Sequence, residues 1–267
     1  MKQRHVIVGA GIIGAALAAH LADSDTSVTV VEADQPGRGT SGSSLAWANA
    51  NGKPPRAYHD LNVAGIRAWR EWAERLGGDW FRQGGGLHWA DPAEAEKLAA
   101  HVAMLAEWDY PARLLTPTEA LHLEPDLAIP AEVREVAYFP EEAYLLTVPA
   151  VQALLDYATA RGVTLVTGDA VAELLATGDR VHGVRLASGT VIEADTVALC
   201  AGWHTPSSPR SWASTSRSSP SMRRAPARPA SLPGATQRRS GSRATSRLLT
   251  LTCGPPSMVV SCSRRAI

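Results

Sequence analysis

Acidic residues are absent from the last 61 residues of this 267-residue chain. Residues 207–267 contain 11 Arg, 15 Ser and 7 Pro, and they lack Asp, Glu, Lys, Tyr and Phe. Residues 1–206 contain 15 Lys plus Arg and all 26 Asp plus Glu, so the zero net charge of the chain joins a segment of charge −11 to one of charge +11. This composition predicts a folded acidic part followed by a disordered basic tail of low complexity.

Cysteine is also scarce, because the chain has only three: Cys200, Cys253 and Cys262. They form no C-x-x-C pair and have no ligand spacing with histidine, so neither a disulfide framework nor a metal site is expected. A chain of this kind is expected in the reducing cytoplasm. No run reaches the ~18 apolar residues of a membrane helix, so no transmembrane segment is expected.

Three glycines stand at regular spacing after the first apolar segment. Residues 6–8 predict a short strand, and the G-x-G-x-x-G turn that follows contains Gly9, Gly11 and Gly14. In such a turn the first glycine permits the bend, the second lets the backbone approach a pyrophosphate and the third lets the next helix pack on the strand. Ile12 and Ile13 complete this predicted cofactor-binding turn at a helix N-terminus. A signal peptide would also begin with basic and then apolar residues, but it does not explain the glycine spacing.

An acidic residue ends the second predicted strand, residues 27–31. Glu32 follows Gly14 by eighteen positions, close to the ~20 residues at which an acid reaches the adenosine ribose hydroxyls. Its negative charge would repel a 2′-phosphate, which disfavours NADP and leaves FAD or NAD. A glycine-rich turn in another α/β fold is the alternative interpretation.

The segment after the second strand, EADQPGRGTSGSSLAWANAN, resembles the FAD-dependent D-amino-acid oxidase and glycine oxidase family. This resemblance implies FAD as the cofactor and a GR2-type flavoprotein fold. It also implies that small residues lie along the diphosphate and toward the flavin: Gly39, Thr40, Ser41, Ser43 and Ser44. Small hydroxylated residues suit this role because they bond phosphate oxygens without blocking the backbone. A flexible Gly/Ser connector is the alternative.

A second stretch of resemblance lies downstream of residue 146. An amphipathic helix near residues 149–161 and a strand at 163–166 are similar to the elements that return the family's chain to its FAD domain. The resemblance implies that the backbone of Val171 contacts the adenine. It further implies that Ala201 and Gly202, which follow a strand at 196–200, lie beside the dinucleotide, where a missing side chain permits close approach.

These elements predict an α/β fold with a discontinuous Rossmann-like FAD-binding domain, residues 1–55 and 146–206. Residues 56–145 are expected to form a partial α+β substrate domain, and residues 207–267 the tail. A helix near residues 56–78 is expected to bury an apolar stripe: Leu61, Ile66, Trp69, Trp72 and Leu76.

No catalytic residue is assigned, because the family's substrate-binding Arg and Tyr lie mainly in a part of the chain that the tail replaces. The cations Lys53 and Arg56 lie near the flavin-facing loop, although a solvated role is favoured for both. Glu141 and Glu142 are expected to be solvated in a turn. Four histidines show no ligand spacing and are expected to be structural: His59, His88, His101 and His122.

The resemblance implies oxidation of the C–N bond of a small amino acid or amine of the D-amino acid, glycine or sarcosine type. Two alternatives stay open: a truncated, catalytically inactive FAD-binding remnant, and a protein that binds nucleic acid through its Arg-rich tail. We interpret the tail as the product of a frameshift near residue 206, because a GC-rich gene read in the wrong frame yields Arg, Ser, Pro and Ala. Read one nucleotide out of frame, the final residues can encode VRPAEHGRQLLAAGD, which is similar to the family's later R-P-x-x-x-G motif.

Overall fold

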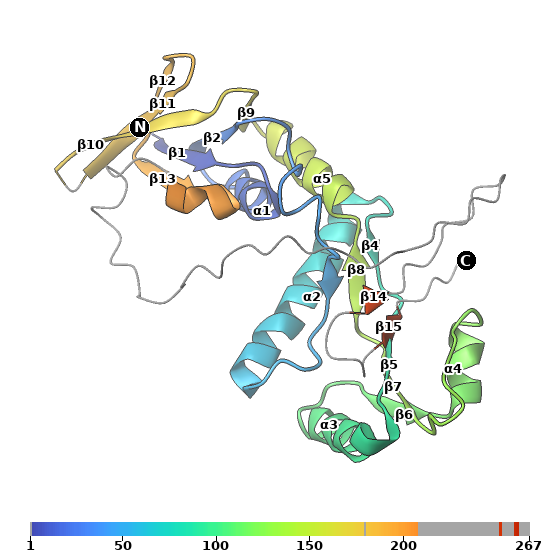
Figure 1. The fold of residues 1–267 in the computed structure, drawn as a ribbon. Coiled ribbons are helices and arrows are strands. Elements are labelled where there is room, and N and C mark those ends of the chain that lie inside the picture. The colour runs from blue at the N-terminus through green and yellow to red at the C-terminus, as the bar shows by residue number, and fades with distance from the viewer. Residues whose placement is uncertain (1, 179, 208–250, 253–258, 262–267) are drawn as a thin grey trace, which may run out of the picture.

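The fold was obtained as a computed structural model that describes residues 2–178, 180–207, 251–252 and 259–261 (Figure 1). Most of the expected tail therefore lies outside the described residues, and so does the prediction that it is disordered. The described part has one lobe built on a parallel sheet and another built mainly of antiparallel strands and helices. The predicted α/β class with a Rossmann-like sheet is confirmed.

Four parallel strands form the central sheet in the order β13-β1-β2-β9. They are short and rich in β-branched residues, which suit a sheet covered on both faces. Their bounds are Gln3–Val8 for β1, Thr26–Glu32 for β2, Thr164–Thr167 for β9 and Thr196–Leu199 for β13. All four strands occur where the sequence predicts them, with ends that differ by one to three residues.

The alternation of side chains along β1 and β2 assigns each residue to one of two faces. Ile7 and Val30 belong to a buried cluster with helices α1 (Ile12–Leu21) and α5 (Thr147–Thr159). Val6 and Val31 belong to a cluster on the opposite face, which an antiparallel sheet covers. That sheet consists of β10 (Val171–Thr177), β11 (Arg180–Leu186) and β12 (Val191–Glu193). The lobe therefore has three layers, namely helices, parallel sheet and antiparallel sheet.

The intervening residues 47–145 build the second lobe. A three-stranded sheet has the order β3-β8-β4, and a larger sheet contains β5, β7 and β6. The bounds of the strands are Trp47–Ala48 (β3), Phe81–Arg82 (β4), Gly86–Trp89 (β5), Arg113–Leu115 (β6), Val136–Phe139 (β7) and Ala143–Leu145 (β8). The helices are α2 (Arg56–Leu76), the 3-10 turn η1 (Pro92–Glu94), α3 (Ala95–Glu107) and α4 (Pro117–Leu123).

Helix α2 joins the two lobes, and its apolar stripe is only partly buried. Ile66 and Trp72 are buried, while Trp69 and Leu76 are half-buried against the core of the parallel-sheet lobe. Leu61 is 67% exposed, so the prediction that it belongs to the buried stripe is wrong. The first half of α2 instead buries His59 and Ile66, which lie on another side of the helix from Leu61.

Helix α4 begins after Thr116, which is its N-cap. The Thr116 hydroxyl accepts a hydrogen bond from the Glu119 N–H, and the Glu119 carboxylate accepts one from the Thr116 N–H. This reciprocal capping box satisfies two backbone donors that would otherwise be unpaired.

Six residues of the tail region have described backbone structure: Ser207 ends a 3-10 turn, Gly202–Ser207, and the other five form two strands. Leu251–Thr252 (β14) pairs with Val259–Ser261 (β15), and β15 pairs antiparallel with β5. The larger sheet therefore has the order β14-β15-β5-β7-β6. These five residues are strands, in contrast to the disorder that the composition predicts.

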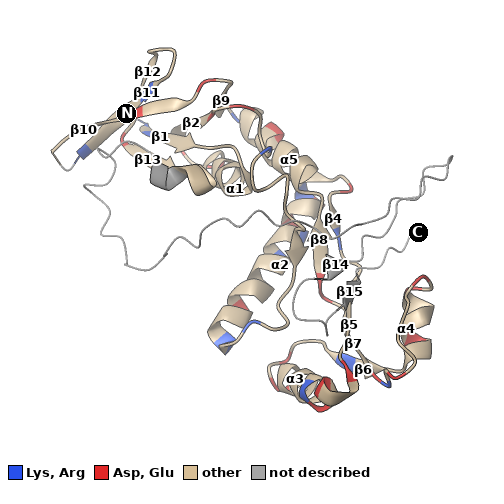
Figure 2. Cartoon of the chain, viewed as in Figure 1, with Lys and Arg blue, Asp and Glu red and all other residues tan. Residues whose placement is uncertain are grey.

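Charged residues of both signs are distributed over the described part of the chain (Figure 2). At one edge of the parallel sheet, the Arg4 guanidinium bonds the carboxylates of Glu193 and Asp195, at 2.5 and 3.2 Å. The partners lie 189 and 191 residues from Arg4 in the sequence. Arg4 thus connects β1 to the end of β12 through Glu193 and to the segment between β12 and β13 through Asp195.

Candidate functional site

The glycine turn between β1 and α1 is packed so closely that side chains are excluded from it. Gly9 has a φ of +102°, and a Cβ there would lie 2.6 Å from the Cys200 carbonyl oxygen. A Cβ on Gly14 would lie 1.9 Å from the Gly9 carbonyl oxygen, far below any real contact distance. The first and third glycines therefore have the mechanical roles that the motif assigns to them.

Helix α1 presents unpaired backbone donors at its N-terminus. Gly11 is the N-cap residue and has no side chain to cap the helix. The Ile12 N–H donates instead to the Ser41 hydroxyl at 3.0 Å. Within the described ranges, the N–H groups of Ile13 and Gly14 have no hydrogen-bond partner. Such donors, with the positive end of the helix dipole, favour a negatively charged group such as a phosphate.

Glu32 faces the glycine turn from the end of β2. Its carboxylate accepts hydrogen bonds from the Ala10 N–H at 2.7 Å and from the Asp34 N–H at 3.1 Å. A carboxylate offers about four acceptor positions, so two remain for the hydroxyl groups of a ribose. The position and the free acceptors of Glu32 fit the predicted contact.

The predicted phosphate loop lies in a series of turns that only partly face the helix. Ser41 is half-buried, and its carbonyl oxygen accepts a hydrogen bond from the Thr147 hydroxyl at 2.7 Å. The Ser44 hydroxyl accepts from the Ala46 N–H at 2.9 Å, so it stabilises the loop itself. Gly39, Thr40 and Ser43 are exposed. Of the five predicted loop residues, Ser41 is the one whose side chain bonds the α1 N-terminus.

Ser41→Ala is expected to lower the free energy of unfolding by about 1 kcal/mol, because it removes the acceptor of the Ile12 N–H. Ser43→Ala is the matched control, since the exposed Ser43 hydroxyl makes no hydrogen bond to the described residues. Its effect is expected to stay within about 0.5 kcal/mol. Urea denaturation followed by circular dichroism measures both. Equal effects of the two variants would contradict the capping role.

The remaining predicted cofactor contacts are Val171, Ala201 and Gly202. Val171 begins β10 and pairs with Leu186, and it packs with Ala201 in the cluster between the sheets. Cys200 follows β13 and donates its N–H to the carbonyl of Val8, the last residue of β1, at 2.8 Å. Ala201 and Gly202 therefore lie at the end of β13, next to the glycine turn that follows β1. Burial raises the pKa of the Cys200 thiol. The structure therefore gathers the glycine turn, Glu32, Ser41 and the end of β13 at the carboxyl ends of adjacent strands.

Glu142 is fully buried, so the prediction that it is solvated is wrong. It accepts hydrogen bonds from the Asn51 N–H and side chain and from the Trp47 indole. Burial raises the pKa of its carboxyl to about 7, although these hydrogen bonds oppose the rise. Sequence reasoning missed this residue because its partners lie 91 and 95 positions away. Glu141 instead forms an ion pair with Arg70 at 2.6 Å.

Three of the four predicted structural histidines have defined surroundings in the second lobe. The His59 Nδ1 is 2.8 Å from the Ala50 carbonyl oxygen, and the His101 Nε2 accepts from the Gly52 N–H at 3.2 Å. His88 is buried, its Nε2 has no partner among the described residues, and burial lowers its pKa to about 4. It is therefore neutral at pH 7. His122 is exposed on α4.

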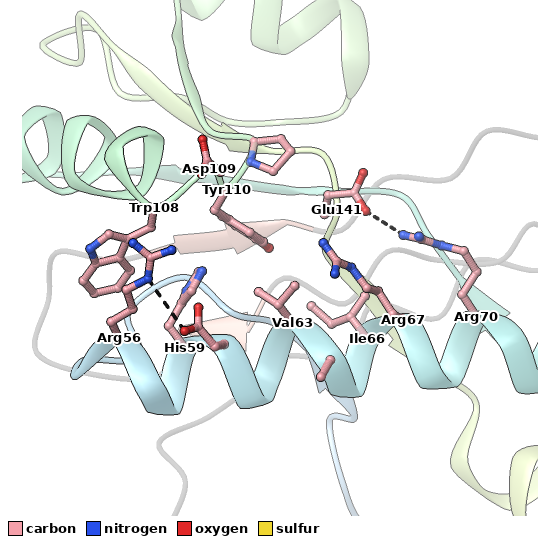
Figure 3. Close-up of a pocket in the computed structure, with 13 residues that line it drawn as sticks. Arg56, His59, Val63, Ile66, Arg67, Arg70, Trp108, Asp109, Tyr110 and Glu141 are labelled. Atoms are coloured by element: carbon pink, nitrogen blue, oxygen red, sulfur yellow. Dashed lines mark hydrogen bonds and ion pairs between the residues drawn. The ribbon is translucent and has the colours of Figure 1, made fainter.

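A cavity of about 560 Å³ lies between α2 and the Trp108–Pro111 segment (Figure 3). Arg56, one of the two candidate cations, lines it and is paired with Asp60 at 3.7 Å. Lys53 is half-buried and is not among the lining residues. Within residues 2–178 and 180–207, no group of three His, Cys, Asp or Glu is arranged to hold a metal ion. None of the described helices is long and apolar enough to cross a membrane.

Several solved structures share this fold at TM-scores well above 0.5. L-proline dehydrogenase from P. horikoshii has a TM-score of 0.70 at 24% identity, with 78% of this chain and 55% of that one covered. L-amino acid deaminase from Proteus myxofaciens has a TM-score of 0.66 at 23% identity, with 76% and 46% covered. Glycine oxidase from Bacillus cereus has a TM-score of 0.63 at 19% identity, with 74% and 55% covered. The chain thus spans about half the length of these structures.

The sequence itself gives the assignment. A family model described as DAO, FAD dependent oxidoreductase, matches residues 4–230, which include the glycine turn, Glu32, the whole second lobe and the end of β13. The match begins in β1 and extends into the basic segment. The chain therefore belongs to the DAO family of FAD-dependent oxidoreductases.

Proposed function

We propose that this protein binds FAD and uses it to oxidise the C–N bond of a small amino acid or related amine. The observation that carries the proposal is the glycine turn, where Gly9 and Gly14 leave no room for a Cβ and α1 presents free N–H groups. Membership of the family supports FAD over NAD. The names of the similar structures, which include a proline dehydrogenase and a glycine oxidase, support an amino acid as the substrate.

The residues that would hold the cofactor follow the order of its parts. The Val171 backbone would contact the adenine, and Glu32 the ribose hydroxyls. The N–H groups of Ile13 and Gly14 would bond the pyrophosphate. The Ser41 hydroxyl would lie beside them, and so would Gly11, whose missing side chain would let the pyrophosphate approach the backbone. The exposed Gly39, Thr40, Ser43 and Ser44 would lie farther along the diphosphate, and Ala201 and Gly202 would border it from β13.

The chemistry divides between cofactor and chain. When bound, FAD supplies an acceptor for the hydride that leaves the carbon bearing the amino group. The described residues would bind and orient the cofactor, and the second lobe would exclude water on one side. No described residue is assigned to the substrate carboxylate, because the Arg56 guanidinium faces Asp60 in a separate cavity.

FAD titration of the purified chain tests the proposal, with an absorption spectrum from 300 to 550 nm and quenching of free FAD fluorescence as readouts. Gly11→Val is expected to weaken FAD binding by about tenfold or more, since its Cβ would lie 3.1 Å from the Ser41 hydroxyl oxygen, beside the α1 N-terminus. Gly65→Ala is the control, because a Cβ on Gly65 would meet no atom within 4 Å. Circular dichroism verifies that both variants are folded.

Three outcomes are informative. Bleaching of the bound flavin by an amino acid in the absence of oxygen supports the whole proposal, and the amino acid that bleaches fastest identifies the substrate type. Flavin binding without bleaching supports the inactive FAD-binding remnant. A wild-type chain that binds no FAD, or binding that Gly11→Val leaves unchanged, would rule out the proposed cofactor site.

A further inference from the structure

Glu142 lies in the turn between β7 and β8 and is 0% exposed. Its Oε1 accepts from the Asn51 N–H at 3.1 Å and from the Asn51 side-chain amide at 2.5 Å. Its Oε2 accepts from the Trp47 indole N–H at 3.0 Å. Both oxygens of a buried carboxylate thus bind one short segment of the chain, Trp47–Asn51. A fully buried acid is rare unless its oxygens are satisfied in this way.

The space around the carboxylate is fitted to it. A Cβ on Gly86 would lie 2.7 Å from Oε2, so only glycine permits the carboxylate to occupy this position. The Glu142 backbone is held as well, because its carbonyl oxygen accepts from the Gly85 N–H at 2.9 Å. Glu142 is therefore fixed from one side by β5 and can act as an anchor for the segment on its other side.

The anchored segment continues directly from the predicted phosphate loop. Ser44 bonds the Ala46 N–H, and Ala46 accepts from the Leu145 N–H at 3.0 Å. Trp47–Ala48 is strand β3, which pairs with β8. The Ala50 carbonyl bonds His59 on α2. The contacts of this segment with Leu145, β8 and His59 thus connect the loop beside the α1 N-terminus to the second lobe.

We propose that Glu142 is a positioning residue that fixes the Trp47–Asn51 segment and, through it, the loop that binds the cofactor. The link to the cofactor rests on the proposed function, whereas the anchoring of the segment does not. A carboxylate suits this role better than an amide, since all three groups that bond it are donors and the NH₂ of glutamine would face one of them.

Amide hydrogen exchange of the flavin-free chain tests the anchoring. Glu142→Gln is expected to increase exchange in peptides covering residues 45–52 by at least tenfold, with peptides of β1 and α5 unchanged. Glu141→Gln is the matched control, because Glu141 is adjacent and bonds Arg70 but does not contact the segment. Equal exchange in wild type and Glu142→Gln would overturn the proposal. If Glu142→Gln does not fold, Asn51→Ala removes one of the three donors from the opposite side, and unchanged exchange there would overturn it as well.

The cofactor link is tested by FAD titration of the same proteins. Glu142→Gln is expected to raise the FAD dissociation constant by at least tenfold and to shift the visible flavin band, with Glu141→Gln within twofold of wild type. Faster exchange with unchanged FAD affinity would overturn the link while leaving the anchor. A wild-type chain that binds no FAD would overturn the proposed function and the link, and the exchange result would still decide whether Glu142 anchors the segment.

Discussion

Replacing Gly14 with Ala is expected to lower the free energy of unfolding by about 3 kcal/mol or more. The added methyl group would lie 1.9 Å from the Gly9 carbonyl oxygen, so α1 could not keep its distance from β1. Neither partner can yield easily, because the contact is with backbone and not with a flexible side chain. Ala15, Ala18 and Ala19 on the same helix are fully buried, so a shifted helix would disturb the core of the lobe.

Urea denaturation followed by far-ultraviolet circular dichroism measures this loss. Gly65→Ala, in the interior of α2, is the matched control because the same methyl group meets nothing within 4 Å there. That variant is expected to be more stable than wild type by about 1 kcal/mol, since Ala favours a helix more than Gly does. A Gly14→Ala protein as stable as wild type would show that α1 does not pack on β1 at this distance.

The contribution of Glu142 to stability is expected to fall by up to about 3 kcal/mol as the pH rises from about 4.5 to about 7. Buried His88, whose pKa is lowered to about 4, changes the stability in the opposite direction, so the Glu142 effect is measured as a difference between proteins. Burial raises the pKa of the Glu142 carboxyl from 4.5 to about 7. The folded state therefore binds this proton more strongly than the unfolded state does, and the contribution is complete below 4.5 and lost as the pH passes 7. Burial raises the pKa of the nearby Tyr110 as well, and the charges of Glu142 and Glu141 add to that rise.

Free energies of unfolding at pH 5, 6, 7 and 8 test this dependence by comparison of three proteins. The curves of wild type and Glu141→Gln are expected to be parallel across this range. Glu142→Gln cannot ionise, so its curve is expected to lack the Glu142 contribution. Relative to wild type, its free energy of unfolding is expected to increase by up to about 3 kcal/mol as the pH rises across this range. Parallel curves for wild type and Glu142→Gln would mean that the carboxyl titrates in the folded chain near its ordinary pKa.

The sequence predicts the first lobe well because its signals are local. The glycine turn follows a β-branched strand within a few residues, and its G-x-G-x-x-G spacing can be recognised without the distant residues, such as Cys200, against which it packs. The helix α5 and the strands β9 and β13 also follow from short local patterns. The position of Glu32 at the end of β2 results from the same short unit of about 30 residues.

The features that the sequence does not predict depend on distant partners. Glu142 occurs in a Pro-Glu-Glu turn that looks solvated, and only the fold brings Trp47 and Asn51 to it. Leu61 has the correct helical spacing but lies where α2 faces solvent. The two-residue strands β3 and β4 are too short to show a period.

The strand order β13-β1-β2-β9 has a consequence for the birth of the protein on the ribosome. Strand β1 leaves the ribosome early, but its neighbour β13 is encoded about 190 residues later, as the 191-residue separation of Arg4 and Asp195 illustrates. At synthesis rates of about 5 to 20 residues per second, one edge of β1 stays unpaired for about 10 to 40 s. The nascent chain thus exposes an apolar strand edge for this time, and any interruption of translation before Thr196 leaves that edge without its β13 partner.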